Sequence, residues 1–455
     1  MEQETKTIEK DRIAAWVVSA LGILVIGGGF VLWLIEKRPP AYGIAAAGLS
    51  LLLFIVGCLR FVPRWMAFWS RRSDAPEIER EPKHVLLRVA LLAIGAELVL
   101  LAAVTVVLRV QYGAGFTWRG AVEFWRCLDS AHYLDITREW YISDGDWGRV
   151  VQLVFLPGYP LTVYPLYRIL GSDIGAGLLV SAAAFPAVCC VLYRLVRLDA
   201  GHRTAFRTVE MLLLLPGGFF FIAPMSESLY LLLALSTLYL ARKKRFLFAG
   251  LCGAYCAFTR TLGLLLIAPL VLEWVHALPV ESRDRREWAK GIVAVLLVPL
   301  GFVAYLWINR TVSGNALQFL TYQRDHWSQR LGWFFNTASY QTEYLVESIR
   351  SGSRENILGL WLPNVVWHFG ALGLFAVGAK RLRPSYAAWF IAYFLIAIGA
   401  TWLLSGPRYL LTMPAVAMLL ANCTESRWKR WAFGALLVPL SALYLIVFVL
   451  RWQVW

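Results

Sequence analysis

One short stretch of the chain carries acidic side chains and an imidazole at helical spacing. Asp129, His132, Asp135 and Glu139 follow one another at steps of three or four residues, which places their side chains on one face of a helix. Carboxylate and imidazole groups accept and donate protons in acid–base catalysis. At a membrane surface this face is a candidate active site. A solvated amphipathic helix without a catalytic role would show the same spacing.

Four further polar residues stand between apolar runs, where a purely structural scaffold has no need of them. Ser226 and Glu227 interrupt one apolar stretch, Arg260 lies at the tip of an apolar hairpin, and Arg408 lies between two apolar segments. Arg side chains bind phosphate through two donors at once, so two Arg residues beside a carboxylate cluster suggest a lipid phosphate as ligand. The alternatives are that Ser226 caps a helix with Glu227 in its first turn, and that each Arg anchors the chain at the membrane interface.

Other candidates carry a weaker signal. Glu97 lies in the middle of an apolar segment, where an ionisable group suggests a function or a pairing with a Trp or Arg of a neighbouring helix. His326 and Trp327, with Gln323 just before them, are candidates to line a substrate groove. The cysteines predict neither a disulfide framework nor a zinc site, because six of the seven lie in apolar segments and only Cys127 in a polar loop. Nothing in the carboxylate spacing requires a divalent metal, and the sequence leaves one open.

The composition shows what must position these groups. Apolar residues make up 59% of the 455 residues and charged residues only 16%, which is typical of a polytopic membrane protein. The 21 Trp residues suit membrane interfaces or the binding of a sugar or lipid. The net charge of +15 is explained by Lys and Arg in cytoplasmic loops, so nucleic-acid binding is not inferred.

Apolar runs predict an all-α transmembrane bundle of about thirteen spans. Several of the middle spans are shorter than the roughly 20 residues that cross a bilayer. The predicted spans cover residues 13–35, 41–62, 85–108, 174–198, 206–223, 228–240, 246–259, 262–275, 291–308, 357–377, 386–404, 409–420 and 431–450.

The Lys and Arg residues predict the orientation of the bundle. With a cytoplasmic N-terminus, every short loop on that side is basic, as in 242–245 and 283–290, which is the positive-inside pattern. Two long loops, about 109–173 and 309–356, then face outward and carry amphipathic helices. We expect residues 1–84 to form an N-terminal hairpin with a basic cytoplasmic loop, and residues 85–455 to form the catalytic transmembrane domain.

The polar segments resemble the PIG-V family, the GPI mannosyltransferase 2-like enzymes and their bacterial relatives. The stretch DSAHYLDI at 129–136 is similar to the family signature W-D-x-x-H/Y-Y-L-x-I-A. Further similar segments follow in the order of the family, namely FLPGYP at 155–160, SESL at 226–229, TRTLG at 259–263, the segment 318–327, and RY at 408–409. The chain departs from the pattern at Leu128 in place of Trp, at Trp140 in place of Gly, and at Gly158 in place of a bulky residue.

The resemblance implies a GT-C fold and a membrane glycosyltransferase. Such an enzyme moves a sugar, here mannose, from a polyprenyl-phosphate donor to a hydroxyl of a lipid or glycan acceptor at the exoplasmic face, with inversion. The implied membrane is the bacterial plasma membrane, or the endoplasmic reticulum in a eukaryote. Asp129 would be the general base, and the substrate-binding residues would be His132, Asp135, Tyr159, Glu227, Arg260, Gln323, Trp327 and Arg408.

Two other functional classes remain open from the sequence. A transporter or flippase of a lipid-linked sugar could use the same polar groups as a binding pathway. The absence of inverted-repeat symmetry and the gathering of acidic residues in a long outer loop count against it. A non-catalytic scaffold subunit would tolerate the loss of Asp129.

Overall fold

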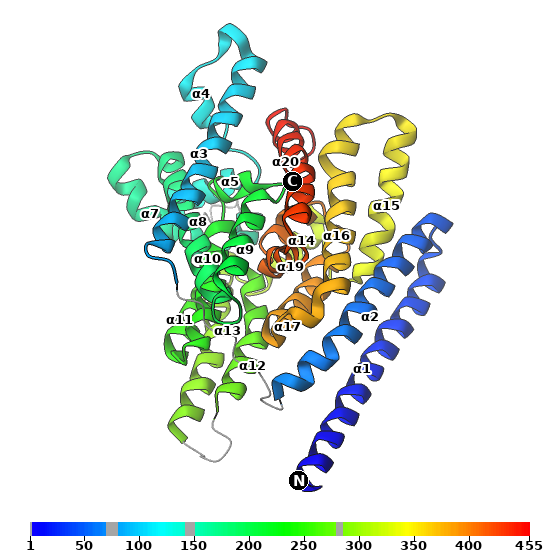
Figure 1. Cartoon of the computed structure of the whole chain (residues 1–455). Coiled ribbons are helices and arrows are strands. Elements are labelled where there is room, and N and C mark those ends of the chain that lie inside the picture. Colours follow the sequence, from blue (N-terminus) through cyan, green and yellow to red (C-terminus); the bar gives the residue numbers. More distant parts are fainter. Residues whose placement is uncertain (1, 70–80, 142–150, 279–284) are drawn as a thin grey trace. The chain divides into compact units, whose positions relative to one another are not determined.

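The chain is helical throughout its described regular structure. The computed structural model describes residues 2–69, 81–141, 151–278 and 285–455, and it contains helices with one isolated antiparallel bridge between Leu331 and Ala400 (Figure 1). The all-α prediction is therefore confirmed. The chain divides into two compact units. Unit 1 comprises Met1–Ile78, Leu331–Gly434 and Arg451–Trp455, and unit 2 comprises Glu79–Arg330 and Ala435–Leu450.

Unit 2 contains the stretch with the acidic helix. Its α-helices are α3 (Val85–Tyr112), α4 (Trp118–Glu123), α5 (Asp129–Glu139), α7 (Gly158–Leu170), α8 (Asp173–Val196), α9 (His202–Leu214), α10 (Glu227–Arg242), α11 (Phe246–Thr259), α12 (Ile267–Ala277), α13 (Arg285–Ser313), α14 (Gln318–Trp327) and the second part of α20 (Arg427–Val449). Short 3-10 turns connect some of them, namely η1 (Gly113–Gly115), η2 (Val151–Val154), η3 (Gly218–Phe221) and η4 (Thr261–Leu266).

Close helix packing holds unit 2 together. Helix α8 packs against α3, α7 and α10, and α11 packs against α10 and α13. A Cβ atom added at Gly301 would lie 1.8 Å from the carbonyl oxygen of Ala254. Small residues therefore let α11 and α13 approach closely, as is common where helices associate in membranes.

Unit 1 is built from the two ends of the chain. Its helices are α1 (Glu2–Lys37), α2 (Ala41–Trp69), α15 (Phe334–Ser351), the π-helix η5 (Asn356–Trp361), α16 (Leu362–Gly378), the 3-10 turn η6 (Ala379–Arg381), α17 (Pro384–Tyr393), the π-helix η7 (Phe394–Ile398), α18 (Gly406–Leu411), α19 (Pro414–Cys423) and the first part of α20. Helices α1 and α2 pack against each other, and α2 packs against α15 and α16. The predicted N-terminal hairpin thus lies in one unit with segments that follow residue 330.

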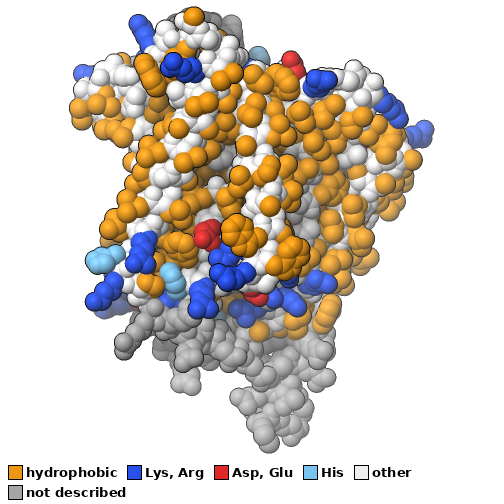
Figure 2. Space-filling view, turned by 45° about the horizontal axis from the view of Figure 1, so that its top comes forward, with side chains coloured by type: hydrophobic (Ala, Val, Ile, Leu, Met, Phe, Trp, Pro, Cys, Tyr) orange, Lys and Arg blue, Asp and Glu red, His pale blue; other side chains and the backbone are white. Residues whose placement is uncertain are grey.

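Fewer helices can cross a membrane than the sequence predicted. Seven of the described helices are long and apolar enough, instead of about thirteen, and hydrophobic side chains cover most of the surface visible in Figure 2. The predicted spans 206–223, 228–240, 246–259, 262–275, 386–404 and 409–420 are not among the seven. The seven candidate spans are Ser19–Lys37, Ala41–Trp69, Val85–Gly115, Asp173–Val196, Arg285–Ser313, Asn356–Arg381 and Arg427–Val449.

Backbone breaks and short lengths explain the difference. Helix α9 ends at Leu214, because Leu215 is extended before Pro216 and Gly217 has a φ of 101°. Met413 is extended before Pro414 and separates α18 from α19. Helix α10 has 16 residues and so spans about 24 Å, less than the roughly 30 Å of a hydrocarbon core.

The predicted orientation can be tested on two exposed residues of unit 2. Asp325 lies on α14, in the second predicted outer loop, and Lys244 lies in a basic loop after α10. In intact cells, a membrane-impermeant thiol reagent should label Asp325→Cys and should not label Lys244→Cys, with the unmodified chain as the background for the seven native Cys residues. The reverse labelling would overturn the orientation and the side of the candidate site.

Candidate functional site

Asp129 is the first residue of α5, and the predicted helix is confirmed over Asp129–Glu139. Asp129, His132 and Asp135 are half-buried, and Glu139 is exposed. A carboxylate in the first turn is favoured by the helix dipole.

The turn before α5 has a constrained backbone, and it positions Asp129, the first residue of the helix. Leu128 has a φ of 51°, an uncommon conformation for a non-glycine residue that is often found at functional sites. The buried Ser130 hydroxyl fixes this turn, because it accepts from the Cys127 amide at 2.7 Å and donates to the Trp125 carbonyl at 2.7 Å. Leu128, the position at which the sequence departs from the pattern it resembles, thus lies in a strained turn.

A buried polar cluster connects α5 with α10 and the end of α11. The Tyr133 hydroxyl, one turn after Asp129, lies 3.0 Å from the Ser226 hydroxyl. Arg260 donates to that same hydroxyl over 3.3 Å, and it forms an ion pair with Glu227. Three segments far apart in the sequence, all predicted to carry site residues, therefore meet at one place in unit 2.

Burial sets the character of this cluster. The side chain of Glu227 is fully buried and that of Arg260 is 11% exposed, and the Arg260 guanidinium lies 5.7 Å from the centre of the Tyr230 ring. Such a pair is held strongly, because loss of one partner leaves a charge in a low-dielectric site. Ser226 occupies the N-cap position of α10, but its side chain makes no capping hydrogen bond. The capping alternative is therefore wrong for the side chain.

Asp135 belongs to a different set of charges. It pairs with Arg138, whose Nε lies 3.2 Å from Asp173 at the start of α8. Arg126 binds the same carboxylate with both guanidinium nitrogens, at 2.8 and 2.9 Å, and this contact raises the pKa of Arg126 further above its ordinary value. This network ties α5 to α8, so Asp135 has a structural role that its spacing did not predict.

Aromatic rings line the region between α5 and α14. His132 stacks on Phe155 with ring centres 4.5 Å apart, and Trp327 meets Phe155 edge-on at 6.1 Å. Phe155 is held in turn by Tyr141, whose hydroxyl donates to the Phe155 carbonyl over 2.5 Å. Gln323 lies one turn before Trp327 and is half-buried.

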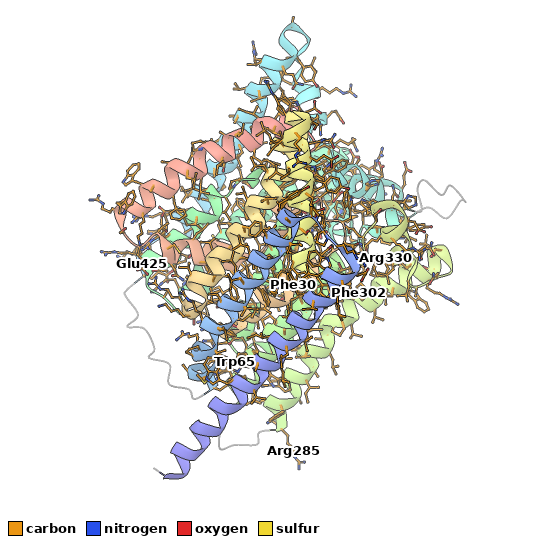
Figure 3. The ribbon with its side chains drawn as sticks, turned by 90° about the vertical axis from the view of Figure 1, so that its right-hand side faces the viewer. Phe30, Trp65, Arg285, Phe302, Arg330 and Glu425 are labelled. Atoms are coloured by element: carbon orange, nitrogen blue, oxygen red, sulfur yellow. The ribbon has the colours of Figure 1, made fainter. Side chains whose placement is uncertain are left out.

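Helix α14 is fixed by α13. The Phe302 ring, labelled in Figure 3, meets Phe319 edge-on at 5.9 Å, and Asn309 accepts from the Phe319 amide over 3.2 Å. The Tyr305 hydroxyl donates to the Leu153 carbonyl over 2.6 Å. These contacts connect α13, α14 and the η2 turn just before Phe155.

Tyr159 is placed as a structural residue. Its ring is fully buried, and its hydroxyl donates to the Gly177 carbonyl and contacts the Ser181 hydroxyl, both at 2.9 Å. It lies edge-on to Tyr133 at 5.4 Å. Tyr159 therefore positions Tyr133 and leaves no surface for a substrate.

Gly158 lets α7 start in direct contact with the end of α11. A Cβ atom added at Gly158 would lie 2.8 Å from the Thr259 Cα and 3.0 Å from the Phe258 carbonyl oxygen. Thr259 is the residue before Arg260. The close approach of α7 and α11 thus requires glycine at position 158.

Substitution of Gly158 should be costly. Gly158→Ala must push α7 away from α11, and overpacking of this kind destabilises by about 1–3 kcal/mol. Gly95→Ala is the matched control, because Gly95 is also helical and nothing lies within 4 Å of an added Cβ. Melting temperatures in detergent should fall for the Gly158 variant only. Equal melting temperatures would show that α7 and α11 are not this close.

Arg408 belongs to unit 1 and is 4% exposed, on α18. Side chains of α15 and α16 fix the irregular segment before it. Asn364 accepts from the Gly406 amide at 2.9 Å and donates to the Leu404 carbonyl at 2.8 Å. Gln341 donates to the Leu403 carbonyl over 3.0 Å. Buried backbone groups outside regular helices need such partners, and these two amides supply them beside Arg408.

The carboxylates do not form a metal site in the described structure. Within residues 2–69, 81–141, 151–278 and 285–455, no three side chains of His, Cys, Asp or Glu come together as metal ligands. Asp135 and Glu227 are both paired with guanidinium groups.

Three aromatic residues of this region were not predicted from the sequence as site residues. The Tyr133 hydroxyl connects α5 to the Ser226 hydroxyl, and the Phe155 ring packs against the rings of His132 and Trp327. Tyr322 on α14 is 5% exposed, and its hydroxyl makes no hydrogen bond among the described residues. Tyr133 could have been found, since it lies four residues after Asp129 and hence on the same helix face.

Comparison with known proteins gives distant similarities. No protein-family model matches the chain, and no curated protein sequence matches it. It is similar to ArnT from Cupriavidus metallidurans bound to undecaprenyl phosphate, with 17% identity over 79% of this chain and 76% of that one and a TM-score of 0.43. It is also similar to the Archaeoglobus fulgidus oligosaccharyltransferase tethered with an acceptor peptide, with 14% identity over 80% of this chain and 55% of that one and a TM-score of 0.44. At this distance neither similarity assigns an activity.

Proposed function

We propose that this chain is a membrane glycosyltransferase of the GT-C type. It would move a sugar, mannose by the sequence resemblance, from a polyprenyl phosphate to an acceptor hydroxyl at the exoplasmic face. The observation that carries the proposal is the cluster of Tyr133, Ser226, Arg260 and Glu227, in which Tyr133 lies one turn after Asp129 on α5. It joins three of the segments that resemble the PIG-V family.

The proposed reaction is a single displacement at the anomeric carbon. The acceptor hydroxyl loses its proton to the Asp129 carboxylate as its oxygen forms the new bond to that carbon. The bond from the anomeric carbon to the phosphate oxygen breaks, and the polyprenyl phosphate leaves with the electron pair. Attack from the face opposite the leaving group inverts the anomeric centre. A nearby guanidinium stabilises the charge that develops on the phosphate.

We propose different roles for the remaining residues. Arg260 is a proposed phosphate ligand within its cluster, and Arg408 is one on the strength of the sequence alone. The buried Glu227 holds the Arg260 guanidinium in place through an ion pair. Tyr159 holds the Tyr133 ring in place through an edge-on ring contact. His132 and Trp327, both in contact with Phe155, are proposed to bind the flat faces of a sugar together with Gln323 and Tyr322. Asp135 keeps α5 in position through Arg138.

Transfer by the purified protein tests this function. The protein is incubated with labelled polyprenyl-phosphate mannose and candidate lipid acceptors, and Asp129→Asn serves as the control. The expected result is a labelled, mannose-containing lipid with the unmodified protein and almost none with the variant. Failure with every acceptor, or equal transfer by the variant, would count against the proposal.

One observation favours the alternative of a transporter for a lipid-linked sugar. Glu97 is 4% exposed in the middle of α3, a candidate span, and its Oε1 makes no hydrogen bond among the described residues. The sequence had left open a pairing with a neighbouring Trp or Arg. Ionisable groups in such places often belong to transport pathways. If Glu97→Gln abolishes transport of a lipid-linked sugar and Asp129→Asn does not, the transporter is favoured.

A further inference from the structure

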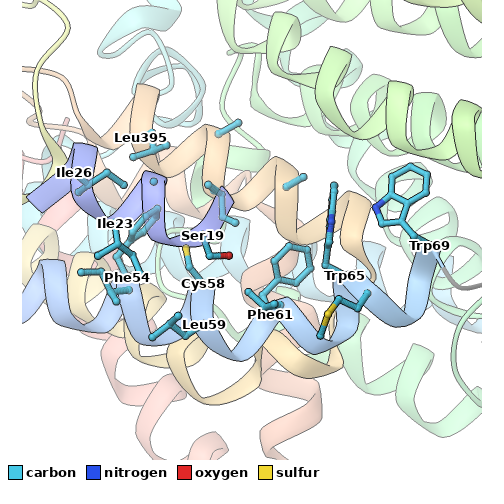
Figure 4. Close-up of a pocket in the computed structure, with 17 residues that line it drawn as sticks. Ser19, Ile23, Ile26, Phe54, Cys58, Leu59, Phe61, Trp65, Trp69 and Leu395 are labelled. Atoms are coloured by element: carbon cyan, nitrogen blue, oxygen red, sulfur yellow. The ribbon is translucent and has the colours of Figure 1, made fainter. Parts of the chain in front are cut away.

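Unit 1 contains an apolar groove that the proposed reaction does not use. It has a volume of about 940 Å³ and lies between α1, α2 and the segment from α17 into η7 (Figure 4). Ser19, Ile23 and Ile26 of α1 form one wall, at the spacing of a single helix face. Phe54, Cys58 and Trp65 of α2 line the floor, with the rest of that face down to Trp69.

The position of the groove determines what surrounds it. Its α1 and α2 walls belong to the candidate spans Ser19–Lys37 and Ala41–Trp69. The groove therefore opens to hydrocarbon, and an occupant must be apolar over most of its length. From Phe54 to Trp65, α2 rises about 16 Å, which matches the roughly 15 Å of one leaflet of a 30 Å hydrocarbon core. A lipid chain of one leaflet fits this length.

Aromatic side chains line the end of the groove at Trp69, and basic residues lie beside it. Trp65 and Trp69 lie there, and Trp is typical of the head-group level of a bilayer. The turn η6, with Lys380, packs against α2, and the Arg383 guanidinium lies 5.0 Å from the centre of the Phe68 ring. Cations at this level attract an anionic head group.

We propose that this groove binds one anionic phospholipid of the leaflet that contacts the Trp69 end. An acyl chain runs along α2 between Phe54 and Trp65, and the phosphate lies near Arg383. By the charge pattern of the loops this is the cytoplasmic leaflet. The lipid would therefore be distinct from the sugar carrier, which the proposed reaction uses at the outer face. Its function would be to keep α1 attached to α2. Most of the described surface of α1 is not buried by other parts of the protein, so lipid contacts would stabilise its position.

A photoreactive lipid tests the site directly. The full chain is reconstituted in phosphatidylcholine vesicles with a trace of phosphatidylglycerol that carries a diazirine on its acyl chain. After irradiation, the labelled residues are mapped by mass spectrometry. Adducts should concentrate on α2 between Phe54 and Trp69, and unlabelled phosphatidylglycerol should displace them better than phosphatidylcholine does.

Two glycines of α1 provide a matched pair of variants. Nothing lies within 4 Å of a Cβ added at Gly22, which lines the groove, or at Gly28, which does not. Gly22→Trp should fill the groove and lower the labelling of α2 at least about tenfold, the change expected from about two buried methylene groups. Gly28→Trp should leave it unchanged. Ala392→Phe fills the groove from the opposite wall and should repeat the loss if Gly22→Trp does not fold.

Three results would overturn the proposal. The first is adducts that mark the exposed apolar faces of all helices equally, as unspecific lipid contact would. The second is labelling of α2 that survives in both groove-filling variants. The third is competition by phosphatidylcholine that equals competition by phosphatidylglycerol, which would remove the assignment of an anionic head group.

Discussion

Asp129→Asn should lower single-turnover transfer by about 10²–10⁴-fold. Asn keeps the size of the side chain and most of its hydrogen bonding, but it cannot accept the proton of the acceptor hydroxyl. Asp129 is half-buried at the first position of α5, so the substitution removes little packing. Donor binding and melting temperature should stay near those of the unmodified protein. The measurement is transfer with saturating donor, beside a separate donor-binding assay.

Asp135→Asn is the matched control for Asp129→Asn. It makes the same chemical change six residues away on the same helix, but it weakens the pair with Arg138. We expect a smaller loss of transfer, accompanied by a lower melting temperature. If Asp129→Asn retains the turnover of the unmodified protein, the base assignment is wrong, and the transporter or scaffold alternative gains support.

Arg260→Ala should lower both stability and donor use. It takes away the guanidinium that neutralises the fully buried Glu227, and breaking a buried ion pair by removing one partner costs about 3–5 kcal/mol. If Arg260 also contacts the lipid phosphate, loss of that charged hydrogen bond makes the free energy of donor binding less favourable by about 1.5–3 kcal/mol. Melting temperature and donor affinity report these two effects separately.

A double variant separates the structural role of Arg260 from its proposed catalytic role. Arg260→Met combined with Glu227→Gln removes both charges and keeps the approximate volume, and such replacements of buried pairs are often neutral. The melting temperature should recover, while donor use should stay low. Arg408→Ala is the comparison in unit 1, with the same expected loss of donor affinity. Recovery of donor use in the double variant would show that Arg260 is purely structural.

Local features of the fold could be predicted from the sequence. The spacing of the polar residues between Asp129 and Glu139 predicted a helix, and α5 covers that range. This prediction was possible because helical periodicity depends only on neighbouring residues. The longest apolar runs, such as 85–108 and 174–198, correspond to candidate spans in α3 and α8. Several shorter runs are not candidate spans, because residues such as Pro216 and Pro414 break the helices. A count of apolar residues does not detect these breaks, since the apolar run continues through them.

The composition by itself determined that this is a helical membrane protein, and the polar segments within its apolar sequence gave the residues proposed to form a site. The partners of those residues were decided only by the tertiary structure. Arg260 meets Glu227 across 33 positions of the chain, and Tyr133 meets Ser226 across 93. Sequence spacing cannot encode such pairings, because they depend on how α5, α10 and α11 are placed against one another. Burial likewise distinguished Tyr159, whose hydroxyl donates a hydrogen bond to the Gly177 carbonyl, from Asp129, which remains half-buried at the start of its helix.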